Sequence, residues 1–487
     1  MNLPTSAEPA DNDALESDEL PKITFGDAFR VWCRVGLLSF GGPTAQVAVM
    51  HQILVEEKKW ISESRFLHAL NYCMLLPGPE AQQLATYLGW LLHGTRGGLA
   101  AGVLFILPGF VTIALLSLLY VHTLGTNIST TGHILAALFF GLKPAVVAIV
   151  VAAVRRITSK VLNRSFLMVI AALTFAGIFV FEIPFPWLIL LAIGVGMVGS
   201  YFFPDLIATG KGEHGVAKST GKHGVLDQRA QEINRPWWMT LLVLATWLAI
   251  WFIPLYILQL CLGPDSIYVE QGWLFSKSAL VTFGGAYAVL PYIQQQAVDK
   301  YGWLDASQMM DGLGMAESTP GPLIMVVQFV AFLAAYQMPG ELTPIEGGLL
   351  GSIIAVWATF VPCFLFIFVG APYVERLRSN KLLAGGLSVV TAAVVGVVLN
   401  LAVGFTLGVM FGDPGERYTT LISPWVVARY YWPDWSTFQI GNGVLLVISL
   451  LLVFVWKRSL FVVLGVSCFL GALYYLATHW QAIQQGL

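Results

Sequence analysis

The hydrophobic pattern divides the chain into long apolar stretches separated by short polar connections. Because the hydrocarbon core of a bilayer is about 30 Å thick, a spanning helix needs about 20 mostly apolar residues. Thirteen stretches approach this length: 26–54, 66–93, 97–121, 134–155, 165–181, 185–204, 236–260, 273–296, 306–337, 345–371, 383–410, 440–456 and 459–478. The pattern therefore predicts an all-α polytopic membrane protein with about 13 transmembrane or re-entrant helices.

The composition supports this prediction and excludes most soluble classes. Hydrophobic residues make up 57% of the chain and charged residues 11%, against about 25% charged residues in soluble domains. So few charges cannot cover a globule of this size with a hydrated surface. The net charge of −2 leaves no basic excess for nucleic acid, and we expect no nucleic-acid partner.

The sequence contains no signature of an enzyme or of a bound cofactor. There is no HExxH, no P-loop and no flavin or haem motif. The five cysteines form no CxxC pair: Cys33, Cys73, Cys261, Cys363 and Cys468. We therefore expect a protein that is not an enzyme and that holds no cofactor or metal. We also expect that it is not an ATP-driven pump.

Lysine and arginine predict the orientation, because short cytoplasmic loops carry an excess of both residues. They gather in the connections 155–164, 205–235 and 372–381 and at Lys457–Arg458. The connections 122–133, 261–272 and 338–344 contain neither. These two sets alternate along the chain if the N-terminus is cytoplasmic and the C-terminus periplasmic. The acidic segment 1–21 is then a disordered cytoplasmic tail, and 205–235 is a cytoplasmic linker loop.

An internal repeat relates the two halves at an offset of 243 residues. The repeated motifs are Phe40–Gly42 with Phe283–Gly285, Trp60 with Trp303, and Pro77–Pro79 with Pro320–Pro322. Over 35–80 against 278–323, 13 of 46 positions are identical without a gap. Glycine and proline interrupt the segments 26–54, 66–93, 273–296 and 306–337, so whether these segments span fully or are re-entrant stays open.

The predicted orientation makes the two halves inverted copies of each other. The helix after Gly97-Gly98 runs outward from the cytoplasm, whereas the helix after Gly347-Gly348 runs inward. We divide the chain into an N-terminal transport repeat (22–204), a linking transmembrane helix (236–260) and a C-terminal inverted transport repeat (261–487). Inverted repeats with broken segments at matching positions are typical of secondary transporters, whose sites lie near the midplane of the membrane.

The breaks are candidate anion sites, because a broken helix exposes orphan N–H groups and the positive end of its dipole. Glycine lets a ligand approach the backbone, and proline ends the hydrogen-bond ladder. The alternative interpretation is that these residues only pack and kink helices. The candidate substrate-binding residues at the breaks are Ser39, Gly41, Gly42, Pro77, Gly78, Glu80, Gln82, Gln83, Gly284, Gly285, Pro320 and Gly321.

Four ionisable residues are further candidates for the predicted anion site. Arg34 and Lys277 occupy equivalent positions in the repeat, and two converging cations would suit a doubly charged oxyanion. The alternative is that both side chains extend to the lipid headgroups. Glu80 and Glu317 lie beside the two Pro-Gly-Pro motifs and are candidates for proton coupling. The alternative for both carboxylates is a capping role at the helix break.

At these motifs the sequence resembles the long-chain form of the chromate ion transporter family. The resemblance rests on Ser39–Pro43, Leu76–Ala85, Trp90, Gly94–Leu99 and Leu107–Gly109 in the first half, and on Thr282–Gly285 and Pro320–Pro322 in the second. It covers roughly residues 22–410. The second half departs from the first where Ala286 stands in place of Pro43, which leaves open whether both halves contact substrate equally.

The resemblance implies a multi-pass protein of the bacterial inner membrane that exports chromate and confers chromate resistance. It implies transport driven by the proton motive force or by anion exchange, with sulfate as a competing ion. A sulfate-like anion channel or uptake permease is the alternative, and a membrane enzyme that reduces chromate is a third. The expected partners are chromate and the lipid bilayer. The sequence leaves the oligomeric state open, with a homodimer among the alternatives.

Overall fold

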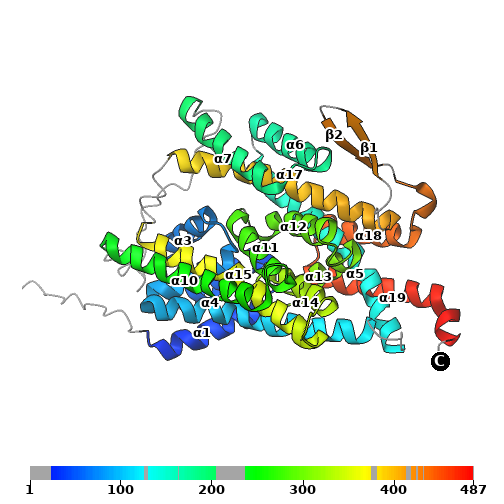
Figure 1. Ribbon diagram of the computed structural model, residues 1–487, viewed down its shortest axis with the longest axis horizontal. Coiled ribbons are helices and arrows are strands. Elements are labelled where there is room, and N and C mark those ends of the chain that lie inside the picture. The colour runs from blue at the N-terminus through cyan, green and yellow to red at the C-terminus, as the bar shows by residue number, and fades with distance from the viewer. Residues whose placement is uncertain are drawn as a thin grey trace, which may run out of the picture.

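The computed structural model describes residues 23–124, 130–162, 164–203, 236–283, 285–373, 381–412, 418–423, 426–431 and 433–485. Helices dominate this part of the chain (Figure 1). The predicted acidic tail, the predicted linker loop 205–235 and Gly284 lie outside the described residues.

The described residues of the first half form eight helical elements. In chain order they are α1 (Phe25–Leu38), α2 (Gly42–His51), the π-helix η1 (Gln52–Glu57), α3 (Glu63–Leu75), α4 (Glu80–Leu124), α5 (Thr130–Val161), α6 (Ser165–Phe179) and α7 (Phe185–Phe202). The helix α10 (Trp237–Leu262) follows at the position predicted for the linking helix.

The second half begins with the same order of elements as the first. It comprises α11 (Ile267–Val281), α12 (Ala286–Gln294), the π-helix η2 (Gln295–Lys300), α13 (Ala306–Ser318), η3 (Leu323–Met325), α14 (Val326–Gln337), α15 (Pro344–Gly370), η4 (Ala371–Tyr373), α17 (Lys381–Phe411), η5 (Trp435–Thr437), α18 (Ile440–Phe454) and α19 (Leu460–Gln485). The bounds of η1 and η2, and those of α3 and α13, differ by the same 243 residues as the sequence motifs. Because π-helices are rare, their matched positions extend the repeat from sequence to structure.

The long helix α4 is a tight hairpin of two antiparallel arms. His93 (φ −137°) and Gly94 (φ +61°) leave the helical conformation, and the chain reverses there. A Cβ atom added to Gly97 would lie 2.2 Å from the carbonyl oxygen of Gly89, so only glycine permits this approach. The two arms correspond to the predicted segments 66–93 and 97–121, with the break at Pro77–Pro79 preceding the first arm.

Seven helices in the described part of the chain are long and apolar enough to cross a membrane. They are Glu80–Thr123, Gly132–Ser159, Phe185–Phe202, Trp237–Leu262, Pro344–Tyr373, Gly385–Phe411 and Leu460–Thr478. Ser165–Phe179, Leu323–Gln337 and Ile440–Phe454 are shorter and also apolar. The protein is therefore a multi-pass membrane protein, while the count of 13 elements and the inverted orientation of the halves stay predictions.

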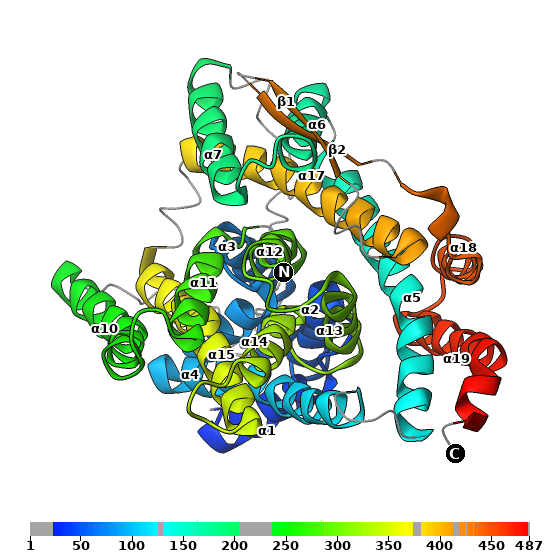
Figure 2. The ribbon, with the colours of Figure 1, turned by 45° about the vertical axis from the view of Figure 1, so that its right-hand side comes forward.

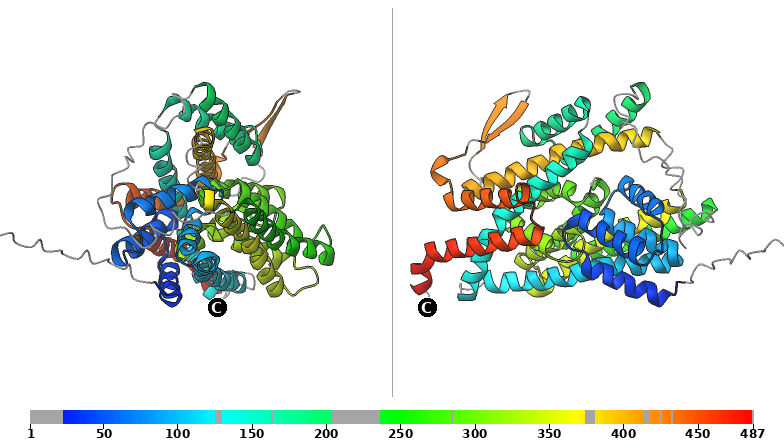
Figure 3. Two further views of the ribbon diagram at one scale, coloured as in Figure 1. Left: turned by 90° about the vertical axis from the view of Figure 1, so that its left-hand side faces the viewer. Right: turned by 180° about the vertical axis from the view of Figure 1, so that it is seen from behind.

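The last two helices of each half pack against the other half. α6 and α7 lie along α17, and α18 and α19 lie along α5 (Figure 2). Small residues permit these contacts: a Cβ added to Gly396 would lie 2.2 Å from the Ala171 carbonyl oxygen, and one added to Gly141 would lie 2.1 Å from that of Ser467. Figure 3 shows the resulting layer of α6, α7 and α17 beside the bundle formed by α1–α4 and α11–α15.

One short hairpin is an exception in the otherwise helical fold. Strands β1 (Tyr418–Ser423) and β2 (Val426–Tyr431) form an antiparallel hairpin in which Tyr418 pairs with Tyr431. Both strands are rich in β-branched and aromatic residues, which favour extended structure. A hydropathy search at the length of a spanning helix cannot detect strands of 6 residues.

We expect a substitution at the hairpin of α4 to destabilise the fold. Gly97→Leu would place a side chain against the Gly89 backbone, where overpacking costs about 3 kcal/mol. Gly194→Leu is the matched control, because nothing lies within 4 Å of a Cβ added to this helical glycine. Thermal unfolding in detergent should show a lower midpoint for Gly97→Leu alone. Equal midpoints would contradict the close packing of the two arms.

Candidate functional site

The four helix breaks predicted from the sequence meet in pairs inside the bundle. The Gly78 N–H donates to the Thr282 carbonyl oxygen over 2.7 Å, and the Gly321 N–H donates to the Ser39 carbonyl oxygen over 2.8 Å. Thr282 is the repeat counterpart of Ser39, and Gly321 is that of Gly78. The same hydrogen bond is therefore made twice with the halves exchanged, as a local two-fold axis requires.

Backbone conformation explains the glycines at these breaks. Gly41, Gly78, Gly285 and Gly321 have φ values of +81°, +126°, +94° and +94°, which L-residues rarely adopt. The prolines on either side of Gly78 and Gly321 lack an N–H, so the glycine supplies the only backbone donor of each Pro-Gly-Pro motif. That donor is the one used to join the two halves.

Each break leads into the start of a helix. α2 begins at Gly42 and α12 begins at Ala286, and the first N–H groups of both helices lack intrahelical acceptors. A Cβ added to Gly42 would lie 4.0 Å from Glu317 Oε2, and one added to Gly285 would lie 3.6 Å from Glu80 Oε1. The two predicted proton carriers thus lie at helix starts of the opposite half, where the dipole favours negative charge.

Glu317 is the more deeply buried of the two carboxylates, with 2% of its surface exposed. It lies on α13, and the Tyr287 hydroxyl of α12 donates a hydrogen bond to its Oε1. Tyr287 was not among the predicted residues. Its signal in the sequence is its position two residues after the Gly284-Gly285 pair.

Three buried amide side chains surround the breaks. Gln46 Nε2 donates to the Gly321 carbonyl oxygen (2.6 Å), Gln83 Nε2 donates to that of Pro77 (2.7 Å), and Gln82 Nε2 donates to the Thr86 hydroxyl (3.0 Å). Gln82 and Gln83 were predicted, whereas Gln46 was not. Its signal in the sequence is an uncharged amide residue four positions after Gly42, and the structure buries it. These amides can donate hydrogen bonds to an oxyanion without adding charge.

The two predicted cations are placed differently from each other. Arg34 has half of its side chain exposed and forms an ion pair with Glu57 of η1 at 2.6 Å. Lys277 is exposed on α11. Both side chains are exposed, and a joint cationic site stays a prediction.

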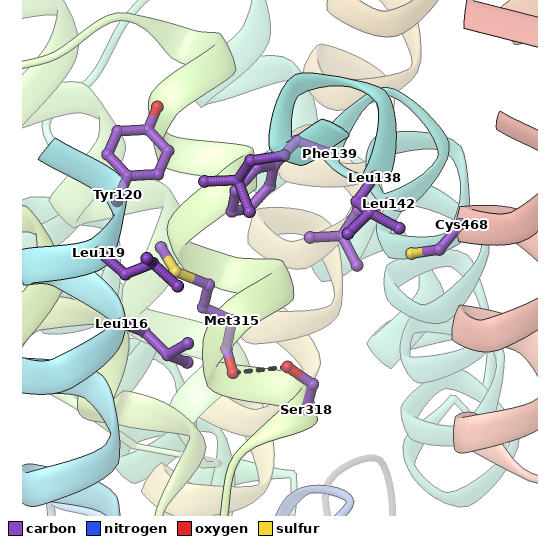
Figure 4. Close-up of a pocket in the computed structure, with 10 residues that line it drawn as sticks. Leu116, Leu119, Tyr120, Leu138, Phe139, Leu142, Met315, Ser318 and Cys468 are labelled. Carbon is purple, nitrogen blue, oxygen red and sulfur yellow. Dashed lines mark hydrogen bonds between the residues drawn. The ribbon is translucent and has the colours of Figure 1, made fainter. Parts of the chain in front are cut away.

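A cavity of about 170 Å³ lies beside α13, between α4, α5 and α19 (Figure 4). Leucine, phenylalanine and methionine side chains form most of its wall, and the polar groups at its edge come from Tyr120 and Ser318. The Ser318 hydroxyl is already used, because it donates to the Met315 carbonyl oxygen over 3.0 Å. An apolar cavity of this kind offers little to an oxyanion, which favours the helix breaks as the anion site.

Repeated halves with broken helices that meet in the interior of a multi-pass bundle are typical of secondary transporters. The sequence matches the chromate transporter family over residues 26–197 and 269–472. The chain therefore belongs to this family.

Individual relatives support the assignment. The chromate transport protein of Pseudomonas aeruginosa is 30% identical over 383 residues, which cover 78% of this chain and 80% of the relative. The chromate transport protein of Cupriavidus metallidurans is 29% identical, with 82% of this chain and 86% of the relative covered. An uncharacterized transporter of Methanocaldococcus jannaschii is 25% identical, with 78% and 84% covered. No solved structure matches the chain.

We expect Gly321→Ala to weaken the contact between the halves. The substitution strains a positive φ and places a Cβ 3.0 Å from Gly109 Cα, which together cost about 2 kcal/mol. Gly340→Ala is the control, since Gly340 also has a positive φ (+68°) but nothing within 4 Å of an added Cβ. Thermal unfolding should show a larger loss for Gly321→Ala. A similar loss in both variants would mean that the contact adds nothing to stability.

Proposed function

We propose that this protein exports chromate from the cytoplasm across the bacterial inner membrane and thereby confers chromate resistance. The observation that carries the proposal is the pair of reciprocal hydrogen bonds, Gly78 to Thr282 and Gly321 to Ser39, which holds the helix breaks of both halves together. The identity of the substrate is inferred from the chromate transport proteins among the relatives.

The chemistry of the breaks suits a tetrahedral dianion. Orphan N–H groups at the starts of α2 and α12 can donate to its oxygens, and glycines there leave room for close approach. The amides of Gln46, Gln82 and Gln83 provide further donors. The proposed substrate site also includes four residues that were predicted from the sequence: Arg34, Lys277, Gly284 and Pro320.

Energetics favour export. With the cytoplasm negative, the membrane potential contributes about 2.3 kcal/mol per charge per 100 mV, and therefore about twice that for a dianion that leaves the cell. Rocking of one repeat against the other would expose the breaks alternately to the two sides. The proton motive force or exchange with another anion completes the proposed cycle. In this proposal the N-terminus is cytoplasmic and the C-terminus periplasmic, which is the orientation that the basic connections predict.

We expect inside-out vesicles that contain the protein to accumulate chromate when a proton gradient is imposed, and sulfate to compete. An uncoupler should abolish accumulation, and vesicles without the protein are the control. Downhill flux that ignores both gradient and uncoupler would instead indicate an anion channel or an uptake permease for sulfate-like ions. Conversion of the added chromate to a reduced chromium species would indicate an enzyme.

We expect the carboxylates at the breaks to oppose anion binding until they are protonated. Replacing Glu317 or Glu80 with glutamine removes a negative charge from the start of a helix, and chromate should bind about tenfold more tightly, a change of about 1.4 kcal/mol. Equilibrium binding to purified protein in detergent measures the affinity. Glu346→Gln is the control, because Glu346 is exposed and glutamine preserves its capping box with Thr343. Unchanged affinity in both break variants would return Glu80 and Glu317 to a capping role.

A further inference from the structure

A second group of ionisable side chains lies inside the bundle, apart from the helix breaks. Asp311 of α13 has only 4% of its surface exposed. Lys143 Nζ of α5 lies 3.7 Å from Asp311 Oδ1, and the Tyr120 hydroxyl of α4 donates to Asp311 Oδ2 over 3.1 Å. Lys143 also donates a hydrogen bond to the Ser307 hydroxyl. We call these four residues the Asp311 cluster.

The two carboxylate oxygens of Asp311 differ in their hydrogen bonding. Oδ2 accepts the hydrogen bond of Tyr120, whereas Oδ1 is buried and has no hydrogen-bond partner among the described residues. A buried carboxylate oxygen without a donor is costly. The Lys143 ammonium stabilises it only through charge, at a distance beyond a hydrogen bond. Oδ1 is therefore the atom of this cluster at which a proton would be bound.

The surroundings of Asp311 contain few other charges. Asp305 at the N-cap of α13 is exposed and adds an electrostatic interaction that opposes the Asp311 carboxylate. Of the other elements packed against α13, η3 and α14 contain no charged residue. Apart from the cluster itself, the charged residues and histidines of the remaining elements are Lys381 in α17, Glu80, His93, Arg96 and His122 in α4, and His133, Arg155, Arg156 and Lys160 in α5. The charge state of the cluster thus depends mainly on Asp311 and Lys143.

The Asp311 cluster joins the two halves of the protein. Tyr120 and Lys143 belong to the first half, and Asp311 and Ser307 belong to the second. The repeat counterpart of Asp311 is His68, so the second half supplies a carboxylate where the first half has none. Any rocking of one half against the other must either carry this ion pair along or break it.

We propose that Asp311 is a proton-binding switch of the transport cycle and that Lys143 and Tyr120 position it. The inference rests on the proposed function. Asp311 Oδ1 takes up one proton from water, and the net charge of the Asp311–Lys143 pair changes from zero to +1. The attraction that holds α13 to α5 is then lost, and the halves are free to move. Ionisable residues inside membranes commonly serve such roles.

The test compares the neutral double variant Lys143→Met/Asp311→Asn with wild type in vesicles. The double variant avoids leaving a single buried charge, so it should reach the membrane in normal amount. We expect its chromate exchange without a gradient to stay within twofold of wild type, while accumulation driven by a proton gradient falls at least tenfold. Glu346→Gln is the control, because Glu346 is exposed on α15 and glutamine preserves its capping box with Thr343.

Continued gradient-driven accumulation in the double variant would overturn the proposal and make the cluster a structural ion pair. If the double variant does not fold, Tyr120→Phe gives the second measurement. Loss of the hydroxyl donor disfavours the carboxylate form, so the pH of half-maximal transport should rise, and an unmoved profile would also overturn the proposal. Absence of both chromate exchange and gradient-driven accumulation in wild type would instead refute the proposed function, whatever the variants do.

Discussion

The fold depends on where the backbone groups at the helix breaks find their partners. At membrane depth there is no water to satisfy an interrupted helix, so its N–H and C=O groups must bond within the protein. Ser39 and Thr282 offer carbonyl oxygens at the first break of each half, and Gly78 and Gly321 offer N–H groups at the second. Because both of these bonds cross between the halves, each half depends on the other for partners at its breaks. The packing of α6–α7 and α18–α19 against the opposite half extends the same dependence to the outer helices.

This arrangement also explains why the breaks suit substrate better than the cavity beside α13 does. The backbone of the breaks is already fixed by partners in the opposite half, so the remaining donors at the starts of α2 and α12 are held in place before a ligand arrives. Preorganised donors bind an anion without the cost of ordering them. The apolar cavity could hold only groups that need no hydrogen bonds.

Much of this site was predictable because the internal repeat allows the two halves of the sequence to be aligned with each other. The offset of 243 located all four breaks, and the matched motifs Pro77–Pro79 and Pro320–Pro322 lie where the structure joins the halves. The same comparison overlooks residues that one half alone contains. In the repeat, Asp311 is equivalent to His68 and Gln46 is equivalent to Val289, so the comparison of the halves reveals neither residue. The β1–β2 hairpin was missed because it contributes no apolar stretch of spanning length, and the pairing of Arg34 with Glu57 depends on how η1 folds back on α1, which spacing along the chain does not reveal.

The unmatched residues matter for a physical reason. Two identical halves related by a two-fold axis in the membrane plane would give inward-open and outward-open states of equal free energy. Any difference between the states must come from residues that break the symmetry. The described breaks are nearly symmetric in backbone, but three acidic residues have no acidic counterpart in the repeat. Glu80 is equivalent to Leu323, Glu317 to Met74, and Asp311 to His68. Removing one partner of a buried ion pair costs about 3–5 kcal/mol, which changes the ratio of two states by more than about a hundredfold. The duplicated backbone thus builds the site, and the few acidic residues without a counterpart are where its two states can be made unequal.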